Sequence, residues 1–117
     1  MKIKTDAKLL RIFVGESDKI NAIPVYEKIV LLAKKEGLAG ASVFKGIMGF
    51  GGNSRIHSSK ILAISEDLPI LIEIVDNEEK IKMFIPKIEE IFDKSKSGGL
   101  ITLEKAEIIK YSYSKKD

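Results

Sequence analysis

Short runs of apolar, β-branched and aromatic residues recur along the chain, and most of them end at glycine or at polar residues. Such runs predict β-strands, because branched and aromatic side chains fit the pleated surface of a sheet. The run at 69–75 is the clearest of them. The predicted strands are 8–15, 41–47, 61–64, 69–75, 100–103 and 106–111.

Two further segments carry apolar residues three or four positions apart, which predicts amphipathic helices. The predicted helices span 20–36 and 77–94. Pro24 suits the first turn of the first helix. At the start of the second helix, Asp76 and Glu79 match a capping box. Pro86 is expected to kink this helix or to end its first half.

The order of these elements is β-α-β-β-α-β, with a short extra strand towards the C-terminus. This order predicts an α+β fold, the ferredoxin-like sandwich, in which two helices cover one face of an antiparallel sheet. We expect a single domain over residues 1–117, with its core at about 8–111. Strands 8–15 and 69–75 are apolar on both faces. Other copies of the chain should therefore cover the face that the helices leave open.

The composition excludes several classes of function. The chain has no cysteine, which rules out disulfides, thiolate metal sites and cysteine nucleophiles. Its 20 basic and 17 acidic residues are interleaved, whereas a nucleic-acid-binding surface would cluster basic residues. No apolar run approaches the length of a membrane span and no signal-peptide pattern opens the sequence, so we expect a cytoplasmic protein without membrane insertion. Abundant Ile, Lys and Glu with no glutamine indicate a thermophilic source.

Glycines gather around the end of the strand at 41–47 and again before the strand at 100–103. The first group includes Gly46, Gly49 and Gly51, and the second is Gly98–Gly99. A backbone rich in glycine can turn its N–H groups towards a phosphate. The same glycines could instead serve turns and a flexible loop at about 48–60. Since the spacing matches neither a P-loop nor a dinucleotide fingerprint, both interpretations stay open.

The loop at 48–60 also holds the only histidine, His57, beside Ser54 and Arg55. A solvated loop imidazole is the simplest interpretation of His57. A metal site would have to bring Glu16 and Asp18 to it, and no ligand spacing supports such a site.

Two carboxylates stand in otherwise apolar strands. Glu73 interrupts the strand at 69–75, and Glu104 follows Leu103. A carboxylate near a core needs a partner. We therefore expect both side chains to pair with Lys or Arg at a subunit boundary rather than to take part in catalysis.

Several short motifs together resemble an uncharacterised prokaryotic family of small proteins related to the PII signal-transduction proteins. The resemblance covers roughly residues 8–111. Its strongest marks are the Ala-Gly-Ala start of the second strand and the glycine-rich turn. The motifs are Gly37-Leu38-Ala39-Gly40-Ala41, Lys45-Gly46-Ile47, Gly49-Phe50-Gly51, Asp67-Leu68-Pro69 and Gly99-Leu100-Ile101-Thr102-Leu103-Glu104.

This resemblance implies a ferredoxin-like subunit in a homotrimer that binds an adenine nucleotide between subunits, without enzymatic activity. The long loop would then dock on a target protein, such as a membrane channel or transporter. The ligand-binding residues implied by the resemblance are Lys45, Gly46, Gly49, Gly51, Gly98 and Gly99. The implied partner-loop residues are Ser54, Arg55 and His57.

The chain departs from the PII pattern in three respects. Leu100 stands where PII proteins have a lysine, the C-terminal arginines are missing, and loop 48–60 has no tyrosine to modify. A nucleoside monophosphate, a cyclic nucleotide or a dinucleotide suits this reduced charge better than a triphosphate. One alternative is a metal-responsive trimer that resembles the divalent-cation-tolerance proteins and uses His57. Another is a nucleotide-processing enzyme with Glu104 or His57 as general base.

Overall fold

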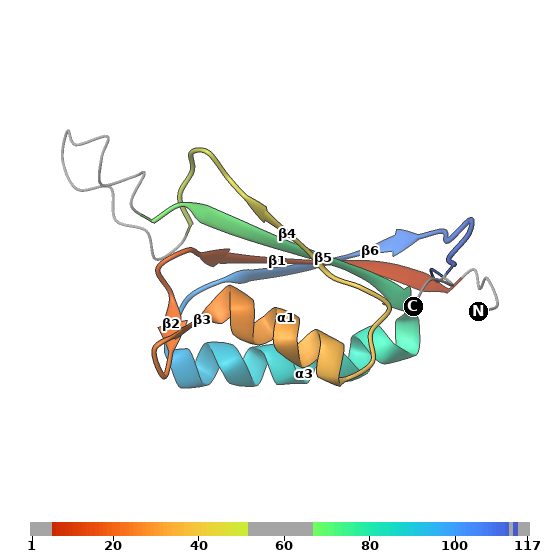
Figure 1. Cartoon of the computed structure of the whole chain (residues 1–117), viewed down its shortest axis with the longest axis horizontal. Helices are drawn as coiled ribbons and strands as arrows, with labels where there is room; N and C mark the ends of the chain where they lie inside the picture. Colours follow the sequence, from red (N-terminus) through yellow and green to blue (C-terminus); the bar gives the residue numbers. More distant parts are fainter. Residues whose placement is uncertain (1–5, 52–66, 113, 115–117) are drawn as a thin grey trace.

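The computed structural model describes residues 6–51, 67–112 and 114, and within them a sheet lies against a layer of two helices (Figure 1). The predicted strand at 61–64 and most of the predicted loop lie outside these residues. The helices are α1 (Val25–Lys35) and α3 (Glu78–Ser95). The strands are β1 (Ala7–Gly15), β2 (Lys19–Ile20), β3 (Ile23–Pro24), β4 (Ser42–Lys45), β5 (Pro69–Asn77) and β6 (Leu100–Ala106).

The main sheet has the order β4-β5-β1-β6, and every neighbouring pair is antiparallel. Both helices lie on the same side of this sheet (Figure 1). The α+β fold with two helices on one face of an antiparallel sheet is therefore confirmed. β1 pairs with β5 over nine residues, so that Ile12 stands opposite Ile72 in the middle of the sheet.

The core lies between the sheet and the helices. Alternate residues of β1 and β5 face this layer, because successive side chains of a strand point to opposite faces. Burying each of the large apolar side chains stabilises the fold by about 1.5–3 kcal/mol. The core includes Leu10, Ile12 and Val14 of β1, Ile70, Ile72 and Ile74 of β5, Val25 and Ile29 of α1, and Ile81, Phe84 and Ile88 of α3.

Helix α1 begins at Val25, five residues later than predicted. Strands β2 and β3 form a hairpin whose two turn residues, Asn21 and Ala22, both have positive φ (51° and 67°). That turn cannot be part of a helix. Pro24 is the N-cap of the helix. Its ring disfavours the helical conformation for the preceding residue, Ile23. The helix therefore starts directly after Pro24.

The prediction that Asp76 and Glu79 cap the start of α3 is wrong. Asn77 is the N-cap, and its side chain accepts a hydrogen bond from the backbone N–H of Lys80 at 2.9 Å. Asp76 is instead buried at the end of β5. The helix also continues through Pro86, which does not end its first half. Pro86 is exposed, so the carbonyl group that loses its helical donor can be hydrated.

The predicted extra strand at 106–111 is wrong. β6 is one strand that ends at Ala106, and the described residues beyond it are irregular. Ala106 is paired with Ala7, the first residue of β1, so the neighbouring strand extends no further. The segment that follows brings Tyr111 to Ala39, where the Tyr111 hydroxyl donates to the carbonyl oxygen at 2.8 Å. In the described part of the chain, neither helix has the length and apolarity that a membrane span requires.

Candidate functional site

A cavity of about 420 Å³ opens at one end of the sheet, where β1 ends and β5 and β6 begin. Strand pairing creates this meeting point, because Gly15 stands opposite Pro69 and Phe13 opposite Leu100. Segments that are distant in the sequence thus share one cavity. Its lining residues are Phe13, Val14, Gly15, Asp18, Phe50, Gly51, Asp67, Pro69, Gly98, Gly99 and Leu100.

Three of the six predicted ligand-binding residues line this cavity: Gly51, Gly98 and Gly99. Lys45 is not among the lining residues, and its Nζ lies 2.8 Å from Oε2 of Glu16. The two other predicted glycines lie beside the cavity and contact its wall at Pro69. The predicted partner-loop residues Ser54, Arg55 and His57 lie outside the described residues.

Close packing accounts for two of the predicted glycines, and the backbone conformation accounts for a third. A Cβ at Gly99 would lie 2.5 Å from Cζ of Phe92, and one at Gly46 would lie 2.7 Å from Cγ of Pro69. Gly49 has a φ of 154°, which disfavours other residues. These three positions therefore need glycine for the fold itself. At Gly51, by contrast, a Cβ would meet no heavy atom within 4 Å.

Two carboxylates, Asp18 and Asp67, form the polar part of the wall. The backbone N–H of Gly15 donates to Oδ2 of Asp18 at 2.9 Å, and that of Ser17 donates to Oδ1 of Asp67 at 3.0 Å. Burial raises the pKa of Asp18, the Gly15 N–H lowers it, and the charge of Asp67 raises it further. None of the lining residues that the structure describes is a lysine or an arginine.

From the sequence alone, Asp18 was a candidate only as a metal ligand, and Asp67 had no predicted role at the site. The residues around Asp18 and Asp67 in the sequence do not indicate that the two side chains meet, because only the pairing of β1 with β5 brings them together. Across the described ranges 6–51, 67–112 and 114, no three His, Asp or Glu side chains gather into a group that could hold a metal ion.

The remaining wall is apolar. Its residues are Phe13, Val14, Pro69 and Leu100, together with the exposed Phe50. An apolar wall beside a few polar groups is the usual construction of a small-molecule site. This cavity can accept a flat apolar ring along the wall and hydrogen-bond donors at the two carboxylates. Gly51 and the turn at Gly98–Gly99 lie beside them in the lining, and glycine-rich segments are of the kind that can form anion-binding concavities.

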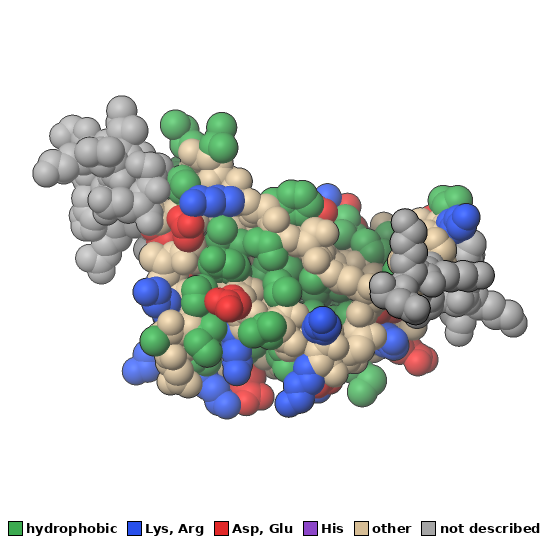
Figure 2. All heavy atoms as spheres, viewed as in Figure 1, with side chains coloured by type: hydrophobic (Ala, Val, Ile, Leu, Met, Phe, Trp, Pro, Cys, Tyr) green, Lys and Arg blue, Asp and Glu red, His purple; other side chains and the backbone are tan. Residues whose placement is uncertain are grey.

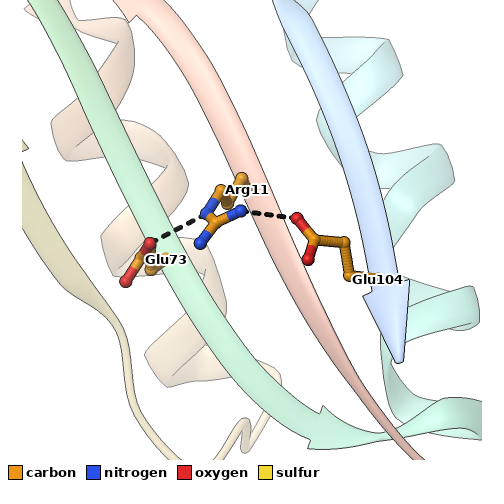
Figure 3. A network of polar contacts seen from close by, with 3 residues as sticks. All are labelled: Arg11, Glu73 and Glu104. Carbon is orange, nitrogen blue, oxygen red and sulfur yellow. Dashed lines mark hydrogen bonds and ion pairs between the residues drawn. The ribbon is translucent and has the colours of Figure 1, made fainter. Parts of the chain in front are cut away.

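On the face of the sheet opposite the helices, Arg11 lies between two carboxylates (Figure 3). Its Nε donates to Oε2 of Glu73 at 2.9 Å, and its Nη1 donates to Oε1 of Glu104 at 2.5 Å. The predicted pairing of both glutamates with a basic residue is therefore confirmed. Their hydrogen bonds and charges raise the pKa of Arg11, with the Glu73 hydrogen bond as the largest cause.

This face, which we call the open face, is largely apolar beyond these three charged residues, with Ser42 and Thr102 as further polar positions. Strand alternation and pairing place Leu9, Phe13, Phe44, Leu71, Val75 and Leu100 on it. Phe44 is 49% exposed and Leu100 is 55% exposed. Figure 2 looks at the molecule with the sheet above the helices, and on this side too hydrophobic side chains reach the surface, over the middle of the molecule and at the tip of the loop that follows β4.

Comparison with solved structures shows what this fold is similar to. A CPII structure from Thiomonas intermedia K12, bound to ADP, AMP and acetate, superposes with a TM-score of 0.63 at 15% sequence identity over 94% of each chain. A divalent ion tolerance protein, CutA1 from Ehrlichia chaffeensis, superposes with a TM-score of 0.57 at 14% identity, over 87% of this chain and 82% of the other. At these identities the likeness shows the fold alone.

The sequence itself gives the closer relationship. A UPF0166 protein of Aquifex aeolicus is 43% identical over 102 residues, which are 87% of this chain and 92% of the relative. The family model described as DUF190, "Uncharacterized ACR, COG1993", matches residues 7–108. Together with the PII-like fold, these matches confirm the resemblance inferred from the short motifs. The chain belongs to the DUF190 family, an uncharacterised family of proteins with a PII-like fold.

Proposed function

We propose that the protein is a non-enzymatic, PII-like regulator that binds an adenine nucleotide in the cavity at the end of the sheet. One observation carries this proposal. The segment that ends at Gly51 and the turn at Gly98–Gly99, two glycine-rich segments far apart in the sequence, line the same cavity. A nucleotide needs both an apolar surface for its base and N–H donors for its phosphate, and we expect the apolar lining residues and the glycine-rich segments to supply them.

The CPII structure supports the choice of ligand, because it is a protein of similar fold bound to ADP and AMP. We infer that the open face packs against two further copies of the chain, which gives a homotrimer. Phe13 and Leu100 belong both to the open face and to the cavity wall. Assembly through the open face would therefore place a neighbouring subunit at the edge of the cavity.

The loop after β4 is the proposed signalling element. Ile47 is 95% exposed, and Met48 and Phe50 are also largely exposed. Phe50 and the next residue, Gly51, also line the cavity. A ligand in the cavity would thus contact the base of the loop, and loop ordering on binding is a common switching mechanism. Its exposed apolar residues would then dock on a target protein.

Calorimetric titration of the purified protein with AMP, ADP and ATP tests the site. We expect Gly51→Val to reduce the affinity at least about tenfold, which corresponds to about 1.4 kcal/mol, because the new side chain occupies the cavity. Gly40→Val is the matched control, since a Cβ there also meets no heavy atom within 4 Å and Gly40 lies outside the cavity. Equal affinity of the two variants would refute the site.

A further inference from the structure

We propose that Asp18 and Asp67 determine which nucleotide the cavity selects, favouring adenosine and AMP over ADP and ATP. The ligand class is a nucleoside, or a nucleoside with a single phosphate, whose hydroxyl or amino groups donate to the two carboxylates. This inference rests on the proposed function, because it concerns the same cavity.

The geometry places both carboxylates around the end of β1. A Cβ at Gly15 would lie 2.7 Å from Oδ1 of Asp67 and 3.1 Å from Oδ2 of Asp18. Both side chains are thus fixed against one glycine, and both line the cavity. The backbone N–H groups of Gly15 and Ser17 hold them there. A larger residue than glycine at position 15 would displace the pair.

These carboxylates can accept hydrogen bonds from a ligand. The backbone donors reach one oxygen of each group, and an ionised carboxylate has about four acceptor positions. Ribose hydroxyls and the amino group of adenine are donors of the required kind. An acidic side chain on the ribose hydroxyls is also the arrangement by which dinucleotide-binding folds recognise a ribose.

The charges around the cavity oppose a chain of phosphates. Asp18 and Asp67 both carry negative charge when ionised, and the described lining residues include no lysine or arginine to offset it. The nearby Lys45 is held by Glu16 at 2.8 Å. Burial and the charge of Asp67 raise the pKa of Asp18, which means that this part of the wall disfavours two negative charges side by side. Each additional phosphate therefore weakens binding.

The test is calorimetric titration with adenosine, AMP, ADP and ATP in the presence of EDTA, which removes divalent metal ions. We expect the wild-type protein to bind AMP at least about tenfold more tightly than ATP. Asp18→Asn and Asp67→Asn should each reduce the ratio of the AMP affinity to the ATP affinity. Asp93→Asn removes the same charge from an exposed position on α3 and should leave the ratio unchanged.

Three results would overturn the inference. The first is ATP binding as tightly as AMP to the wild-type protein, which decides the matter even if the variants fail to fold. The second is an unchanged ratio in folded Asp18→Asn and Asp67→Asn proteins. Either of these would leave the nucleotide site itself intact. The third is no binding of any of the four compounds, which would overturn the proposed function as well.

Discussion

Asp76 holds together three segments that meet at the end of the sheet opposite the cavity. Its side chain is 2% exposed, and its two oxygens accept hydrogen bonds from the backbone N–H groups of Ala39 at 2.8 Å and Asn77 at 2.6 Å. Lys80 also donates from Nζ to the carbonyl oxygen of Gly37 at 3.1 Å. The connection from α1 to β4 is thereby fixed against the start of α3.

Replacing Asp76 by asparagine should lower the free energy of unfolding by about 1–3 kcal/mol, because the amide group turns a donor towards a buried backbone N–H group. Urea unfolding monitored by circular dichroism measures the change. Asp93→Asn alters the same type of residue at an exposed position and should shift stability by less than about 0.5 kcal/mol. Similar midpoints for both variants would contradict this role of Asp76.

At the scale of elements, the two helices end in different ways. After α1, Gly37 has a φ of 79°, its N–H donates to the carbonyl of Lys34, and the N–H of Leu38 donates to that of Ala33. This is a Schellman motif with glycine at the position that requires positive φ. After α3, the left-handed position is taken by Lys96, with a φ of 58°. A lysine in that conformation is strained.

Substituting glycine at this position relieves the strain, so Lys96→Gly should raise the free energy of unfolding by about 1 kcal/mol. Lys94→Gly is the matched control, because Lys94 lies within the last turn of α3 and glycine there should be destabilising by about 1 kcal/mol. Thermal and chemical unfolding of the two variants should therefore move in opposite directions. A loss of stability in both would show that the end of α3 is not strained at Lys96.

The sequence predicted elements well where the signal is local, and poorly where it depends on a neighbour in space. Periodicity was sufficient for both helices and for β1 and β5. The start of α1 was misplaced because the hairpin turn at Asn21–Ala22 has no glycine to mark it. The extra strand at 106–111 was predicted from its apolar residues alone, although a strand also needs a partner, and β1 offers none beyond Ala7.

The candidate site shows the same division. Glycine-rich turns are visible in the sequence, and three of the predicted residues do line the cavity. The acidic pair was missed, because Asp18 and Asp67 meet only through the pairing of Gly15 with Pro69. Lys45 was expected to supply charge to the ligand, but its partner Glu16 belongs to a segment that only the tertiary fold brings near.

At the scale of the whole molecule, a monomer would leave the open face of the sheet exposed to water. Helices cover one face of the sheet (Figure 1). The other face carries apolar side chains around Arg11, which is ion-paired with Glu73 and Glu104 (Figure 3). A large apolar sheet surface is normally covered by protein. Arg11 with its two glutamates can remain paired within such an interface, because both of these ion pairs are made inside the subunit.

An added, unpaired charge on the open face should therefore weaken the association of the subunits. We expect sedimentation to give three times the chain mass of 13.0 kDa for the wild-type protein and a lower average mass for Phe44→Glu. Leu31→Glu is the control, since Leu31 is similarly exposed (56%) but lies on the outer side of α1. Loss of assembly in both variants, or in neither, would argue against the open face as the interface.

A crystal structure of the protein grown with AMP tests the central claim most directly. We predict AMP in the cavity between Gly51 and Gly98–Gly99, with its base against the apolar wall and the open face of each subunit covered by other copies. AMP bound elsewhere, or an empty cavity at a saturating AMP concentration, would contradict the account.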